Sequence, residues 1–154
     1  MKKKISTFLL LIFLSSCGYE AMYSKKNRKN YNFSISKLSL GGSRDINLKI
    51  KEKLNNYTLS KKDKDFIIKV LSTSERLILA KNTSGDPTIF KLKIIVEVET
   101  LKNSKLQSNF VIIENFDYKN NSNKFELKRY EREIKNNLAN IISDKLIYKL
   151  SNIQ

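Results

Sequence analysis

The segment from residue 90 to residue 99 alternates between apolar and charged side chains, and this pattern constrains the fold more than any other feature. The apolar positions are Phe90, Leu92, Ile94, Val96 and Val98. The charged positions are Lys91, Lys93, Glu97 and Glu99, and Ile95 is the single exception. Because successive side chains of a strand point to opposite faces, the pattern predicts a strand with one buried face and one face in water. The fold must therefore contain a sheet that is covered on one face only.

The rest of the chain supplies elements that complete such a sheet. Hydrophobic periodicity predicts strands at residues 31–40, 65–81, 90–99 and 106–118, and helices at residues 44–56 and 124–150. Ser43 is the expected N-cap of the first helix, and the second strand is expected to be bent or bulged. We therefore predict an α+β domain at residues 31–154, with the order β-α-β-β-β-α. Its four-stranded mixed sheet carries both helices on one face, the first two strands are parallel, and the opposite face is left polar and uncovered.

Composition excludes several classes of function. A chain of 154 residues has room for one ordinary domain. With one Cys and no His, it can form neither an internal disulfide nor a zinc site of about four Cys and His ligands, and it has no His base for a hydrolase. Catalysis could use only carboxylates such as Glu97 and Glu99, which lack a partner His. We expect no enzyme activity, no catalytic residue and no metal site.

The N-terminus has the pattern of a lipoprotein signal peptide. Three lysines at residues 2–4 precede an apolar stretch at residues 5–14, which is about half the length that a membrane-spanning helix needs. The following Leu14-Ser15-Ser16-Cys17 resembles a bacterial lipobox. The resemblance implies cleavage before Cys17, a diacylglycerol on its thiol and an acyl chain on the new amine, with no other cofactor. The alternative is a buried core thiol. Residues 1–16 would then be the signal peptide and residues 17–30 the acylated cysteine with a flexible tether.

Gly18 bears on the destination of such a lipoprotein. In enterobacterial lipoproteins, Asp after the acylated cysteine implies retention in the inner membrane. Glycine stands here instead. We therefore expect an outer-membrane lipoprotein that faces the periplasm.

The net charge of +15 raises the possibility of a nucleic-acid-binding protein. However, acidic residues are interleaved with the basic ones along most of the chain, and the Lys-, Asn- and Ile-rich composition is typical of an AT-rich genome. The densest basic run after the N-terminus, at residues 25–29, is either a solvated part of the tether or a contact for an anionic partner. We expect no nucleic acid partner. Intact residues 1–17 and salt-dependent DNA binding would support the opposite interpretation.

Several short motifs resemble the LPS-assembly lipoprotein family (LptE), especially its alphaproteobacterial branch, over most of residues 17–150. The motifs, in chain order, are Cys17-Gly18-Tyr19 with Met22-Tyr23, Arg76, Thr83-Ser84-Gly85, Phe90-Lys91-Leu92-Lys93, Asn115-Phe116-Asp117-Tyr118, Phe125-Glu126 and Tyr130-Glu131. The first strand and the first helix match only in pattern. The resemblance depends on the order and spacing of the motifs.

The resemblance implies a lipoprotein that plugs the large outer-membrane β-barrel for lipopolysaccharide export. It would help that barrel to assemble, take part in lipopolysaccharide transport and contact lipopolysaccharide itself. Lys91, Lys93, Glu97 and Glu99 are the candidates for the partner-facing side of the sheet, with plain solvent exposure as the alternative. Arg76, Lys81 and Lys91 are the candidates for contact with lipopolysaccharide phosphates, with a solubilising role as the alternative. A second hypothesis is another periplasm-facing lipoprotein, such as an auxiliary subunit of a lipid or solute transporter.

Overall fold

The computed structural model describes residues 31–59 and 61–153. The predicted signal peptide, Cys17 and the tether at residues 17–30 lie outside the described residues. The predictions made for these segments therefore stay predictions. The folded domain begins at Asn32.

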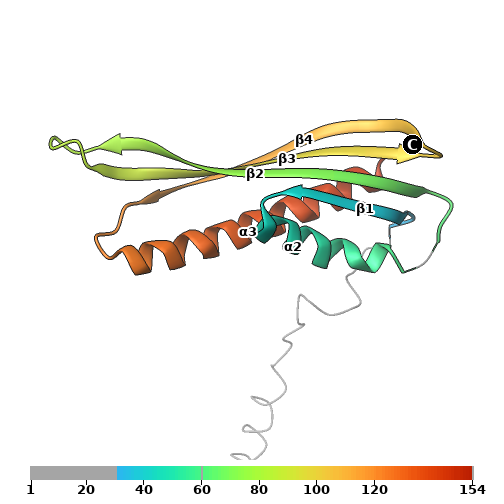
Figure 1. The fold of residues 1–154 in the computed structure, drawn as a ribbon, viewed down its shortest axis with the longest axis horizontal. Coiled ribbons are helices and arrows are strands. Elements are labelled where there is room, and N and C mark those ends of the chain that lie inside the picture. The colour runs from blue at the N-terminus through green and yellow to red at the C-terminus, as the bar shows by residue number, and fades with distance from the viewer. Residues whose placement is uncertain (1–30, 60, 154) are drawn as a thin grey trace, which may run out of the picture. The chain divides into compact units, whose positions relative to one another are not determined.

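The elements of the domain follow one another in the predicted order (Figure 1). They are β1 (Ser34–Gly42), α2 (Arg44–Leu54) with a 3₁₀ turn η2 (Asn55–Tyr57), β2 (Asp65–Lys81), β3 (Pro87–Lys102), β4 (Lys105–Lys119) and α3 (Lys124–Ser151). The first strand begins three residues later than predicted, at Ser34. β2 runs from Asp65 to Lys81 as predicted, and its pairing with β3 is irregular near Ala80.

The four strands form one sheet in the order β1-β2-β3-β4. β1 and β2 are parallel, whereas β2, β3 and β4 are antiparallel neighbours. Both helices lie on the same side of the sheet (Figure 1). The predicted α+β class, the mixed sheet and the placement of the helices are therefore confirmed.

The core lies between the sheet and the two helices. The alternating apolar residues of β3, from Phe90 to Val98, are all buried, as the sequence pattern requires. α2 buries a stripe at Ile46, Ile50 and Leu54, because residues four apart lie on one face of a helix. The Asn123 side chain caps α3 by accepting hydrogen bonds from the N–H groups of Phe125 and Glu126. Ser43 does precede α2, but its hydroxyl makes no capping bond.

A tight connection ends β1 and starts α2. Gly42 has a φ of +91°, and the N–H of Ser43 donates to the carbonyl of Ser72 at 2.9 Å. The Asn47 amide donates to the carbonyl of Gly41 at 2.9 Å and accepts from the Ser72 hydroxyl at 2.8 Å. These bonds satisfy the polar groups of the connection, including the fully buried Ser72. They also fix Gly42 as the last residue of β1, so that β2 continues for nine residues without a strand on that side.

Candidate functional site

The described helices leave the opposite face of the sheet uncovered, and we call it the open face. Its residues come from the odd-numbered positions of three long strands. They are Lys69, Leu71, Thr73, Glu75 and Leu77 of β2, Lys91, Lys93, Ile95, Glu97 and Glu99 of β3, and Asn109, Val111, Ile113, Asn115 and Asp117 of β4. The even-numbered neighbours, such as Val70 and Val98, are buried toward the helices.

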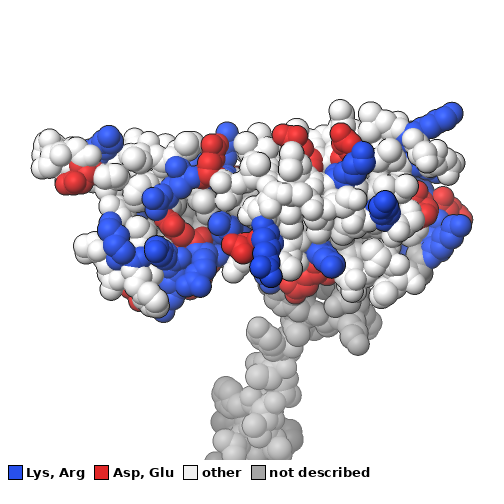
Figure 2. All heavy atoms as spheres, in the orientation of Figure 1, with Lys and Arg blue, Asp and Glu red and all other residues white. Residues whose placement is uncertain are grey.

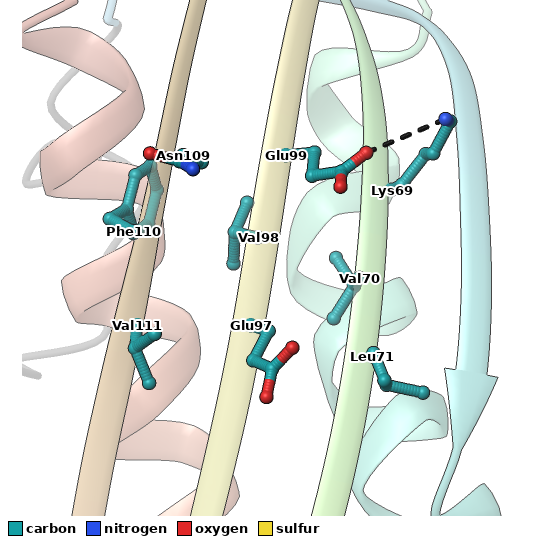
Figure 3. A pocket seen from close by; sticks show the side chains of 9 residues that line it. All are labelled: Lys69, Val70, Leu71, Glu97, Val98, Glu99, Asn109, Phe110 and Val111. Atoms are coloured by element: carbon teal, nitrogen blue, oxygen red, sulfur yellow. Dashed lines mark hydrogen bonds and ion pairs between the residues drawn. The ribbon is translucent and has the colours of Figure 1, made fainter.

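Apolar side chains cross the middle of the open face. Leu71, Val111 and Ile113 are exposed by 48, 52 and 51 %. Exposing apolar side chains to water is unfavourable. Register places Leu71 and Val111 on either side of Glu97, and Thr73 and Ile113 on either side of Ile95. Leu71 and Val111 line a depression that Figure 3 shows from close by. The result is an apolar band with members on all three strands, interrupted by Glu97 and Thr73.

Ion pairs lie on both sides of the apolar band. Lys69 pairs with Glu99 at 3.5 Å on one side (Figure 3). On the other side, Lys93 pairs with Glu75 at 3.3 Å and Lys91 with Asp117 at 3.7 Å. Exposed pairs of this kind contribute about 0–1 kcal/mol each, so their charges remain available to a partner.

Glu97 lies within the apolar band and differs from the other charged residues of the open face. Its side chain is exposed and makes no ion pair or hydrogen bond to any described residue. Its carboxylate is therefore a polar group that a partner could engage.

The structure places all four predicted partner-facing residues, Lys91, Lys93, Glu97 and Glu99, on the open face. The expectation of a polar face is confirmed only in part, because most of its side chains are polar but an apolar band crosses it. Two features of the sequence carry that signal. The run Val111-Ile112-Ile113 does not alternate, and Leu71 adds an apolar residue to the outer side of β2. A strand with apolar residues on both faces needs cover on both, or a partner.

Arg76 has a structural role on the opposite side of the sheet. Its guanidinium donates to Glu131 of α3 at 3.0 Å and lies 4.8 Å from the centre of the Phe90 ring. The Tyr118 hydroxyl donates to the same Glu131 oxygen at 2.7 Å. The hydrogen bond to Glu131 raises the pKa of Arg76, and burial followed by the Glu131 hydrogen bond raises the pKa of Tyr118. Arg76 therefore joins β2 to α3.

The three residues predicted to contact phosphate do not converge. Arg76 lies on the helix side of the sheet, whereas Lys91 lies on the open face and pairs with Asp117. Lys81 is exposed at the end of β2, before the turn at residues 82–86. No single phosphate group meets both Arg76 and Lys91, so contact with lipopolysaccharide phosphates stays a prediction for each residue separately.

The described ranges, 31–59 and 61–153, contain neither a metal-binding cluster nor a membrane-spanning helix. No group of three or more Cys, His, Asp or Glu side chains in these ranges could hold a metal ion. Within the same ranges, no helix has the length and apolar character needed to cross a membrane.

Comparison with known proteins identifies the fold. No protein-family model matches the sequence, and no curated protein matches it. Solved structures do match. The chain is similar to rare lipoprotein B from Shewanella oneidensis, with a TM-score of 0.60 and 16 % identity over 75 % of this chain and 93 % of that one. It is also similar to a minor lipoprotein from Acinetobacter baumannii, with a TM-score of 0.58 and 15 % identity over 79 % of this chain and 91 % of that one. A third similar structure is lipoprotein B from Nitrosomonas europaea, with a TM-score of 0.59 and 15 % identity over 80 % of this chain and 88 % of that one. The domain therefore has the fold of these lipoproteins.

Proposed function

We propose that this chain is an outer-membrane lipoprotein, anchored through lipid on Cys17, that plugs the lipopolysaccharide-export β-barrel and helps it to assemble. In this role it takes part in lipopolysaccharide transport to the cell surface. The observation that carries the proposal is the agreement of two independent features. The leader ends in a lipobox-like Leu14-Ser15-Ser16-Cys17, and the domain that follows has the fold of solved lipoproteins over 88–93 % of their length.

The open face supports contact with a protein partner. Protein interfaces combine an apolar centre with a polar rim. The apolar band with Leu71, Val111 and Ile113 has ion pairs on both sides, which is the same arrangement. A barrel lumen is lined by polar side chains and can hold a folded domain. The paired charges of the open face suit such a wall, since each can exchange its present partner for one on the barrel.

The lipid anchor is tested first. Full-length protein from its native cells should give a mass corresponding to cleavage before Cys17, with one diacylglycerol and one further acyl chain. The Cys17→Ala variant should stay uncleaved and lose that lipid mass. An unmodified wild-type chain that still begins at Met1 would refute the anchor.

The barrel partner is tested by co-purification from detergent-solubilised outer membranes. The Val111→Asp/Ile113→Asp variant places two charges in the apolar band and should lose the barrel while keeping its lipid. Leu48→Asp is the matched control, because Leu48 is 55 % exposed on α2, on the helix side of the sheet. Circular dichroism checks that both variants are folded. Recovery of an inner-membrane ATPase complex instead of a barrel would favour an auxiliary subunit of a transporter.

A further inference from the structure

β2 has a free edge beside the first half of α3. β1 ends opposite Ser72, whereas β2 continues to Lys81. The Ser72 carbonyl accepts from Ser43, so the backbone groups of Ser72 point toward the β1 side. Because backbone groups alternate along a strand, the N–H and C=O groups of Ser74, Arg76 and Ile78 point the same way. No strand among the described residues pairs with them there.

The free edge forms one wall of a groove, and α3 forms the other. The groove exists because α2 runs beside α3 only from about Lys135 onward. Asp45, near the start of α2, lies 3.9 Å from Lys135, and Lys53, near its end, lies 3.0 Å from Asp144. The part of α3 before Lys135 therefore extends beyond α2 (Figure 1). Ser74 and Arg76 line the groove from β2, and Phe125, Lys128 and Arg132 line it from α3.

Positive charge is in excess along the groove. Lys128 and Arg132 are exposed, and neither has an acidic partner among the described residues. Two acidic residues line the groove. Glu131 is held by Arg76 and Tyr118, and the Glu75 carboxylate lies on the open face, where it pairs with Lys93. Figure 2 shows Lys and Arg side chains gathered over this first half of α3. The groove therefore suits a negatively charged occupant.

The spacing of the two unpaired cations matches an extended chain. Residues four apart on a helix are separated by about 6 Å along its axis, and alternate residues of a strand by about 6.6 Å. α3 runs along the length of the sheet (Figure 1). Acidic side chains at positions i and i+2 of an added strand would therefore face Lys128 and Arg132 together. The exposed Phe125 ring offers an apolar contact to the same strand.

We infer that the groove binds an extended acidic segment of a partner protein, which adds a strand to β2 at residues 74–78 and directs alternate Asp or Glu side chains at Lys128 and Arg132. A peptide fits better than a phosphate group because the free edge presents carbonyls as well as N–H groups. A phosphate can accept hydrogen bonds from the N–H groups, but its one or two O–H groups cannot match a row of carbonyls that alternates with N–H groups along the strand. A strand satisfies both, which is how peptides add to sheet edges. This site is separate from the open face and does not depend on the barrel.

The test uses the full-length protein in detergent and an eight-residue fluorescent peptide in which Glu alternates with Thr or Val. Fluorescence anisotropy should detect saturable binding, and the same peptide with Lys in place of Glu should not bind. Lys128→Glu/Arg132→Glu should weaken binding at least about tenfold, because two attractions become repulsions. Lys105→Glu/Lys119→Glu is the matched control. Both of these lysines are exposed on β4, away from the groove, and binding should be unchanged.

Hydrogen exchange identifies the mode of binding. The peptide should slow exchange at the amides of residues 74, 76 and 78 and leave the outer edge of β4 unchanged. Ser74→Pro removes one outward N–H and should weaken binding, since proline is tolerated where the N–H faces away from the ladder. Protection along β4, or no binding at all, would overturn the inference. So would displacement of the peptide by inorganic phosphate or by phosphatidylglycerol vesicles with no change in exchange at residues 74–78, since the groove would then be a simple anion site.

Discussion

Replacing Gly42 by alanine tests the connection that leaves the β2 edge free. A Cβ atom on Gly42 would lie 1.9 Å from the carbonyl oxygen of Ser72, far inside van der Waals contact. The backbone also has a φ of +91°, which L residues with a side chain rarely adopt. To relieve the overlap, the turn must move away from β2. That movement breaks the 2.9 Å hydrogen bond from the Ser43 N–H to Ser72.

The cost can be worked from these contributions. Positive φ costs an alanine about 1–2 kcal/mol. The lost hydrogen bond and the displaced backbone add about 1–3 kcal/mol. Alanine also lowers the conformational entropy of the unfolded chain, which stabilises the folded state by about 0.5 kcal/mol. We therefore expect Gly42→Ala to lower the free energy of unfolding by about 3 kcal/mol, and the Tm by about 10 °C for a domain of this size.

Two other glycines serve as controls for the separate contributions. Gly85 has a φ of +86°, but a Cβ there would meet nothing within 4 Å, so Gly85→Ala should show the conformational cost alone, about 1 kcal/mol. Gly41→Ala would bring its Cβ to 3.3 Å from a methyl group of Leu71, whose side chain is half-exposed and can move. Its effect should stay within about 0.5 kcal/mol.

Urea denaturation of the full-length variants, followed by circular dichroism, measures all three free energies. The expected order of destabilisation is Gly42, then Gly85, then Gly41. If Gly42→Ala costs no more than Gly85→Ala, the close approach of Gly42 to Ser72 does not exist. β1 could then extend beyond Gly42, and the edge of β2 would not be free.

Three further predictions concern the helix side of the sheet. Arg76→Met and Glu131→Gln should each lower stability by about 1 kcal/mol and be non-additive in a double-mutant cycle; if Arg76→Met leaves stability unchanged, Arg76 does not join β2 to α3. Tyr118→Phe should lower the free energy of unfolding by about 1 kcal/mol at pH 7. In urea titrations, the difference in that free energy between variant and wild type should shrink as the pH rises above about 10. The raised pKa of Tyr118 means that wild-type stability is complete below that pH and is lost as the hydroxyl ionises in the unfolded and then in the folded state. Ser74→Pro should leave the Tm within a few degrees, whereas Thr73→Pro, whose N–H points toward β3, should lower it by about 10 °C or more; similar losses would mean that the backbone alternation is assigned wrongly.

Local patterns were sufficient to predict the fold. The alternation from Phe90 to Val98 depends only on the period of a strand, and every apolar residue in it is buried except Ile95, which lies on the open face. The helix stripe at Ile46, Ile50 and Leu54 depends on neighbours within a few residues. Short-range geometry decides each of these features, so a single sequence is enough to predict them.

The open face could be predicted only in part. The charges of β3 were found because they alternate within one strand. The apolar band depends on register, which sets Leu71 and Val111 beside Glu97 across three strands. Register follows from turn geometry and core packing, so the sequence of one strand does not determine which residues of the next strand lie beside it. Leu71 and Val111 were therefore visible as apolar residues but not as one surface.

The groove beside α3 was even less predictable from the sequence, because it depends on where β1 ends and where α2 begins. Lys128 and Arg132 look in the sequence like ordinary charges on a solvated helix face. They line a groove only because β1 ends at Gly42 and α2 begins at Arg44, so that neither element covers the part of α3 before Lys135. Gly42 is thus a determinant of the groove although it contributes no side chain to it. A substitution that lets β1 continue past Gly42 would cover the free edge and abolish peptide binding without changing Lys128 or Arg132.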